Sequence, residues 1–158
     1  MRRLKIAAMF AAATFLALGA ARADTSVAVG TDSNLPVPRF VSLKTPGTNG
    51  RHGPGLEHRV DWIYERIGLP LQVTGESGPW RRVVDPDGAT VWIHAQNLDN
   101  RRMAYVRADA PMRRAARADA QPLAHLGEGV VGAVTACEGD WRRVAVGGRV
   151  GWVEAEAL

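Results

Sequence analysis

The sequence has a single cysteine, and this scarcity limits both the fold and the chemistry. Cys137 has no partner within the chain, so no internal disulfide can form and packing alone must stabilise the fold. Unpaired cysteines commonly behave as small buried hydrophobic residues, and we expect this of Cys137. The alternative is a disulfide between two molecules.

Lysine is also scarce, since Lys44 is the only one after residue 23. Nearly all the remaining basic side chains are therefore arginines. Arginine binds carboxylates in bidentate fashion, so local arginine clusters could hold acidic ligands. A bias in genomic composition explains the same excess without any ligand.

Apart from its first 23 residues, the chain has no excess of positive charge. The formal net charge is +4, but residues 1–23 hold four of the 20 Lys and Arg residues and none of the 16 Asp and Glu residues. The remainder therefore has 16 residues of each sign. Nucleic-acid binding requires a basic surface, so this balance argues against a nucleic-acid partner.

The first 23 residues combine a basic start, an apolar run and the small-residue triplet Ala21-Arg22-Ala23. This pattern predicts a secretory signal peptide that is cut before Asp24. The apolar run from Ile6 to Leu18 is shorter than the roughly 20 residues that cross a bilayer, which argues against a membrane anchor. A lipid anchor is excluded because no cysteine lies at the cleavage site, so we expect a periplasmic or secreted protein.

Residues 24–38 are polar, contain proline and have no sustained periodicity, which is typical of a flexible linker. The rest of the chain is an internal repeat. The sequence WRRV at residues 80–83 recurs at residues 141–144, and Trp92-Ile93 recurs as Trp152-Val153. The two halves, residues 39–100 and 101–158, are therefore expected to be two copies of one domain.

Each half contains short apolar runs separated by turn residues, and neither contains a helical run of useful length. The runs of the first half are FVSLK, DWIYER, LPLQVTG, WRRVV and TVWIHA; those of the second are MAYVR, PLAHL, VVGAVTAC, WRRVAV and RVGWVEA. Short alternating runs at this spacing predict an all-β fold, with one small barrel or sandwich in each half. Residues 99–103 join the halves and are too few to let them move far apart.

Two turns support this pattern. Gly147-Gly148 separates two strand-like runs and supplies the positive φ angles of a two-residue hairpin turn. In the first half, residues 85–89 place Pro86 and Gly88 where a three-residue hairpin loop requires them.

The turns fix the register of the hairpin that follows each WRRV sequence. They place Arg82 opposite Trp92 and Arg143 opposite Trp152. One face of the first hairpin is then apolar and forms the barrel interior, through Val83, Val91 and Ile93. The other face carries indole and guanidinium groups, which either stack on each other or face a ligand.

These motifs resemble the bacterial SH3-like domains of exported and cell-wall proteins. The resemblance rests on NGRHGPG at residues 49–55, on WRRV, and on the closing sequences VWIHAQNL and GWVEAEAL. It implies two tandem five-stranded SH3-like barrels, each closed by a short 3₁₀ turn at HAQNL and EAEAL. It also implies a binding module, since such domains often accompany cell-wall enzymes and recognise peptidoglycan peptides or glycans. The second half departs from the pattern at PMRRAAR, and Arg142 stands where some relatives carry a second cysteine.

Catalytic and metal-binding patterns are not evident. A cysteine nucleophile needs a positioned base, and the four histidines are scattered through the chain: His52, His58, His94 and His125. His52 and His58 are six residues apart with no further ligand at a metal-binding spacing. We therefore expect no enzyme activity, no cofactor and no metal.

The candidate ligand-binding residues are aromatic and arginine side chains. Trp62 and Tyr64 follow the Gly-Pro-Gly loop, and Arg51 and Arg59 flank it, where they could hold a carboxylate. The remaining candidates are Trp80, Trp92, Trp141 and Trp152. Packing within a small barrel is the alternative role for every one of the aromatic residues.

Two functions fit these features. The first is a non-catalytic, exported cell-envelope module that binds peptidoglycan peptides or glycan. The second is a periplasmic adaptor that binds another envelope protein, through strand addition or between its own two barrels. Since the linker is short, a composite site at the junction of the barrels fits either function.

Overall fold

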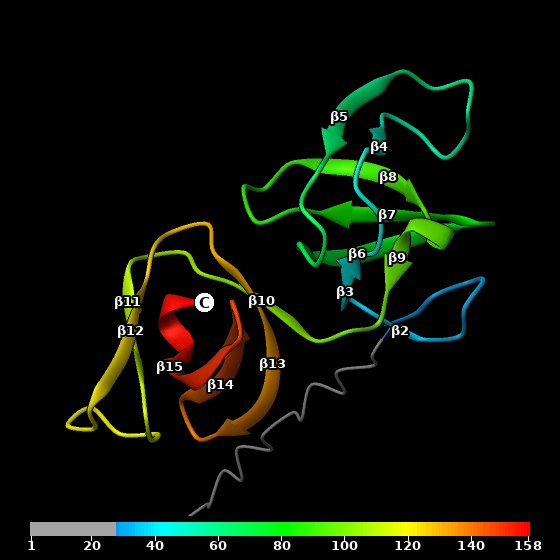
Figure 1. Ribbon diagram of the computed structural model, residues 1–158. Helices are drawn as coiled ribbons and strands as arrows, with labels where there is room; N and C mark the ends of the chain where they lie inside the picture. Colours follow the sequence, from blue (N-terminus) through cyan, green and yellow to red (C-terminus); the bar gives the residue numbers. More distant parts are fainter. Residues whose placement is uncertain (1–27) are drawn as a thin grey trace, which may run out of the picture.

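The computed structural model describes residues 28–158, which form two small β-barrels joined by a short linker (Figure 1). The predicted signal peptide, residues 1–23, lies outside the described residues. No helix in the described part of the chain is long and apolar enough to cross a membrane. The strands and two 3₁₀ turns confirm the all-β prediction.

The first barrel is a seven-stranded sheet with the spatial order β5-β4-β8-β7-β6-β3-β9. Its elements are β3 Arg39–Leu43, β4 Thr48–Arg51, β5 Val60–Tyr64, β6 Pro70–Ser77, β7 Trp80–Val84, β8 Thr90–His94, η1 Ala95–Asn97 and β9 Leu98–Asp99. The 3₁₀ turn η1 occupies the place that the sequence HAQNL predicts.

The second barrel has the order β10-β13-β14-β15-β11-β12, which repeats β3-β6-β7-β8-β4-β5 of the first. Its elements are β10 Met103–Tyr105, β11 Ala110–Arg113, β12 Pro122–Leu126, β13 Val131–Glu138, β14 Trp141–Val146, β15 Arg149–Glu154 and η2 Ala155–Ala157. Strands β4 and β11 are absent from the sequence prediction. Their Asn, Gly and Pro residues are rare in strands, and pairing with neighbouring strands overrides that preference.

The turn and register predictions are confirmed. Gly147 and Gly148 have φ angles of 56° and 77° between paired residues of β14 and β15. The first-barrel loop closes with a 3.0 Å hydrogen bond from the Asp85 amide to the Ala89 carbonyl. Arg82 lies opposite Trp92, Arg143 lies opposite Trp152, and the inner face is fully buried at Val83, Val91 and Ile93.

The two cores differ at one pair of facing positions, where each has one glycine and one larger side chain but in opposite places. In the first barrel Gly50 lies against Val91, and a Cβ atom on Gly50 would come within 2.9 Å of Val91 Cγ2. In the second barrel the register places Met112 where the first has Gly50, and Gly151 where it has Val91. A Cβ atom on Gly151 would lie 2.7 Å from Met112 Sδ. Each barrel therefore has room for one large side chain at this point.

Part of the segment that the composition predicts as a flexible linker is packed against the first barrel. β1 Ala28–Val29 pairs with β2 Pro36–Val37, and the turn between them reaches the end of β6. There the Glu76 carboxylate, whose side chain is 0% exposed, accepts hydrogen bonds from the amides of Asp32 and Ser33 at 3.0 and 2.8 Å. Ser33 and Glu76 are 43 residues apart, so local composition gives no sign of this contact.

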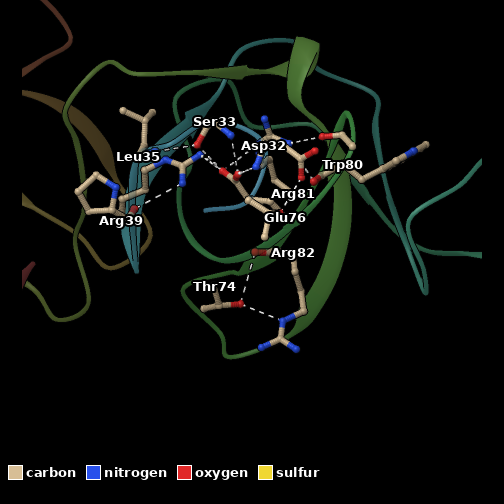
Figure 2. Close-up of polar contacts among 12 residues, drawn as sticks. Asp32, Ser33, Leu35, Arg39, Thr74, Glu76, Trp80, Arg81 and Arg82 are labelled. Atoms are coloured by element: carbon tan, nitrogen blue, oxygen red, sulfur yellow. Dashed lines mark hydrogen bonds and ion pairs between the residues drawn. The ribbon is translucent and has the colours of Figure 1, made fainter. Parts of the chain in front are cut away.

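Glu76 also joins this segment to the barrel. Its Oε1 accepts a 2.6 Å hydrogen bond from Ser33 Oγ and a 2.7 Å bond from Arg39 Nη2, and it lies 3.3 Å from Arg81 Nε (Figure 2). Burial raises the pKa of this carboxyl group, but the hydrogen bonds from Ser33, Arg39 and Asp32 outweigh it and lower the pKa from 4.5 to about 2. The folded state therefore favours the ionised carboxylate.

The lowered pKa of Glu76 predicts acid-sensitive stability. Because the folded-state pKa lies below the unfolded value, the stabilisation is complete above about pH 4.5 and is lost as the pH falls towards 2. We expect Glu76→Gln to lower the free energy of unfolding by about 2 kcal/mol at pH 7, because it removes charge-assisted hydrogen bonds. Urea unfolding across this pH range should show the gap between the two proteins closing in acid. A gap that is the same at every pH would contradict the assignment.

The exchanged core pair gives a second prediction. Gly151→Val should lower the free energy of unfolding by about 1–3 kcal/mol, because the added side chain overlaps Met112 in a filled core. The double variant Met112→Gly/Gly151→Val reproduces the arrangement of the first barrel and should recover part of the loss. Thermal unfolding of the double variant and of both single variants, Gly151→Val and Met112→Gly, measures this. If the double variant loses as much stability as the two single variants together, or more, the two positions do not share one space.

Candidate ligand-binding surfaces

Large apolar side chains are exposed along the hairpin of β4 and β5. We call this region the β5 surface and define it by its four members, Leu56, Val60, Trp62 and Ile63, which are 41–76% exposed. Strand β5 is at the edge of the seven-stranded sheet, and its hairpin extends away from the second barrel (Figure 1). Trp62 and Ile63 are consecutive on the strand and project from opposite faces, so the exposed apolar residues lie around the edge strand. Several large exposed apolar residues within one hairpin are typical of interaction sites.

Arg59 lies beside the β5 surface, whereas Arg51 is committed to the loop. The Arg59 side chain is 75% exposed, and its Nε pairs with Asp61 at 2.9 Å. Arg51 Nη1 donates to the carbonyl oxygens of Leu56 and His58, at 3.0 and 2.7 Å. The Arg51 guanidinium therefore fastens the chain between β4 and β5.

Tyr64 is part of the first core and is 9% exposed. Its hydroxyl donates a 2.9 Å hydrogen bond to Asp85 Oδ2, while Asp85 Oδ1 accepts from the amides of Asp87 and Ala89. Burial and the neighbouring carboxylate raise the pKa of Tyr64 well above its ordinary value. This tyrosine thus connects the core to the loop between β7 and β8.

The other four candidate tryptophans are buried to different degrees. Trp80 is 8% exposed, and its ring meets the His94 ring edge-on at a centroid distance of 5.3 Å. Trp92 and Trp152 are half-buried on the outer faces of their hairpins. Trp141 is half-buried and lines a pocket of about 360 Å³ that also contains three acidic residues: Asp109, Glu154 and Glu156.

A larger cleft of about 590 Å³ lies between the barrels. The first barrel contributes a mostly apolar wall that includes Phe40, which is 70% exposed. The linker and the second barrel contribute four arginines: Arg101, Arg102, Arg107 and Arg142. The barrels touch beside it, where Arg66 Nη1 donates to the Gly129 carbonyl and Met103 lies against Gly68. The short linker therefore holds the barrels close, as the sequence predicts.

A family model describes the fold of both barrels. The model of the bacterial SH3 domain matches residues 44–100 and again residues 106–158. The chain belongs to the bacterial SH3 domain family. This confirms the resemblance drawn from the sequence motifs and the prediction of tandem copies.

Solved structures that match this chain include NlpC2 and NlpC1 from Trichomonas vaginalis, which are 17% and 16% identical to it. The matches cover 77% and 82% of this chain but 47% and 48% of theirs, with TM-scores of 0.33. The chain thus spans about half the length of these structures. A comparison with curated proteins finds no match.

Cys137 is exposed, so the expectation that it is buried is wrong. It lies near the end of β13 in the second SH3 domain, opposite Arg142. The equivalent position in the first domain is Glu76, which is covered by residues 30–35. No such segment covers Cys137 among the described residues, and its sulfur instead lies in the cleft, 3.7 Å from Arg102 Nη2.

Within residues 28–158, no group of three or more His, Cys, Asp or Glu side chains is arranged to hold a metal ion. Arg113 of the second domain repeats the contact of Arg51, because its Nη1 donates to the Ala120 carbonyl at 3.0 Å. Both arginines lie opposite the tryptophan of the second hairpin strand. The second domain thus lacks the Gly-Pro-Gly motif but keeps an arginine that donates a hydrogen bond to the loop.

The contacts of Arg51 predict a structural effect. Arg51→Ala should lower the free energy of unfolding by about 2 kcal/mol, because two loop carbonyls lose a charged donor. Limited proteolysis should also become faster within residues 52–59. Arg59→Ala is the matched control and should change stability by less than about 0.5 kcal/mol, as its ion pair is exposed. Equal stability of the two variants would show that Arg51 does not fasten the loop.

Proposed function

We propose that this chain is an exported, non-catalytic module that binds the cell envelope, with peptidoglycan peptides or glycan as its ligand. Membership of the bacterial SH3 domain family over both halves of the chain supports a binding role. The signal-like pattern of residues 1–23 supports export to the compartment where such ligands occur.

The β5 surface is the proposed contact region, and the exposure of Trp62 is the observation that carries it. The Trp62 side chain is 57% exposed, although a tryptophan in a barrel this small would ordinarily supply core area. An exposed indole offers a large apolar face together with one hydrogen-bond donor. The neighbouring Arg59 is 75% exposed; its Nε pairs with Asp61, and its other guanidinium nitrogens can donate to a ligand carboxylate.

A second candidate is an adaptor that binds another envelope protein by strand addition. Strand β5 favours it, because an edge strand offers backbone groups to a partner strand. The apolar side chains of the β5 surface would then contact side chains of the added strand. The two candidates use the same region but differ in the ligand.

Co-sedimentation with purified peptidoglycan sacculi distinguishes them. We expect the chain without residues 1–23 to be retained, and Trp62→Ala to reduce retention about tenfold, because loss of a well-placed aromatic contact costs 1.4 kcal/mol or more. Thermal unfolding should be nearly unchanged, since Trp62 packs outside the core.

The control variant is Val150→Ala, which removes a 40%-exposed apolar side chain from the other domain and should leave retention unchanged. If the parent chain does not sediment with sacculi, the peptidoglycan proposal is wrong. The adaptor would then be tested by cross-linking from position 62 in envelope extracts.

A further inference from the structure

The internal repeat allows each residue of one domain to be compared with its counterpart in the other. On β6 and β7 Glu76 lies opposite Arg81, and on β13 and β14 Cys137 lies opposite Arg142. Arg39 pairs with Val73 in the first domain, and the carbonyl of Arg102 accepts from the Val134 amide in the second. The triad Arg39, Glu76 and Arg81 therefore corresponds to Arg102, Cys137 and Arg142.

The arginines of the two triads have the same local contacts. Arg81 Nη1 donates to the carbonyl oxygens three residues and one residue before it, at 2.7 and 3.0 Å. Arg142 Nη1 donates to the corresponding two oxygens, at 2.8 and 2.9 Å. Arg39 Nη2 donates to the Glu76 carboxylate, and Arg102 Nη2 to the Cys137 sulfur. The second domain keeps both cations and replaces the carboxylate by a thiol.

The two triads differ in what covers them. In the first domain residues 30–35 close over Glu76 and supply further donors. In the second domain Arg102, Cys137 and Arg142 all line the cleft between the barrels. Among the described residues, no carboxylate side chain forms an ion pair with Arg102 or Arg142.

We propose that Arg102 and Arg142 form a binding site for the carboxylate of a ligand that enters the cleft. The ligand carboxylate would lie beside Cys137, where the first domain has the side chain of Glu76. Arginine is suited to this role because its planar group donates two parallel hydrogen bonds to a carboxylate.

The rest of the cleft specifies the class of ligand further. Its wall on the first domain is mostly apolar, through residues such as Phe40, Val84 and Pro86, so it suits an apolar group next to the carboxylate. Asp85 is the one carboxylate side chain among the described residues that line the cleft, and it already accepts hydrogen bonds from Tyr64 and the loop amides. The site thus fits an acylated apolar amino acid or the C-terminal residue of a peptide. It is independent of the β5 surface and of the proposed function.

The test uses N-acetyl-leucine as the probe and N-acetyl-leucinamide, which lacks the charge, as its control. Cys137 reports occupancy, since it is exposed and is the only thiol of the chain. We expect N-acetyl-leucine to slow the alkylation of Cys137 by iodoacetamide in a saturable manner. The amide at the same concentrations should leave the rate unchanged.

Variants locate the site. Arg142→Gln should weaken binding of N-acetyl-leucine at least about tenfold, as a charged hydrogen-bond pair is lost. Arg143→Gln is the matched control and should have no effect, because Arg143 faces the other side of β14 opposite Trp152. Titrations followed by the guanidinium Nε–H signals of Arg102 and Arg142 measure binding without using the thiol.

A further variant restores the arrangement of the first domain. Cys137→Glu supplies the carboxylate within the chain, so it should abolish binding of the probe and raise the Tm. Cys137→Ser keeps both arginines and should retain binding. The proposal is overturned if no saturable binding is seen, if the amide binds equally well, if Arg143→Gln weakens binding as much as Arg142→Gln, or if Cys137→Glu still binds the probe. None of these outcomes depends on retention by sacculi.

Discussion

The antiparallel register of the two WRRV hairpins is the constraint on which the rest of the structure depends. A shift by one residue would turn every side chain of a strand to the other face, so the tight turns at residues 85–89 and at Gly147-Gly148 determine which residues are buried. With the observed register, Val83 and Val144 lie in the two cores, whereas Arg82 and Arg143 lie outside. The outer arginines and tryptophans follow from this alternation without any requirement for a ligand.

Because the register is the same in both domains, each residue has an equivalent in the other domain. A difference between two equivalent residues can therefore be attributed to their side chains. The exchange of Gly50 and Val91 for Met112 and Gly151 conserves the space between two strands, so it changes packing without changing the fold. The exchange of Glu76 for Cys137 is different, because it removes a charge that two arginines otherwise share. After the first exchange, a side chain of the same domain still fills the space between the strands. After the second, the guanidinium groups of Arg102 and Arg142 face the cleft without the carboxylate that their counterparts share.

Much of the fold could be predicted from the sequence, since strand alternation, turn glycines and the internal repeat are all local signals. Strands β4 and β11 could not, because Asn49, Gly50 and Pro111 disfavour strands and only pairing with neighbours places them there. For the candidate site, the sequence places Trp62, Tyr64, Arg51 and Arg59 around the Gly-Pro-Gly loop but leaves open which of them pack. The exposure of Trp62, the burial of Tyr64 and the loop contacts of Arg51 depend on tertiary packing. The cleft depends on how the domains meet, and no local pattern encodes that.

The segment before the first domain explains why the two copies differ in structure around Glu76 and Cys137. A buried carboxylate is stable only when hydrogen-bond donors compensate for its lost hydration, and residues 30–35 supply three of the donors to Glu76. The second domain follows directly on the linker and has no equivalent segment among the described residues. A glutamate at position 137 would therefore face the cleft with two arginines and solvent only, and it would fill the space beside them. With cysteine there, the same scaffold keeps Arg102 and Arg142 accessible from the cleft, so this position is closed in the first copy and open in the second.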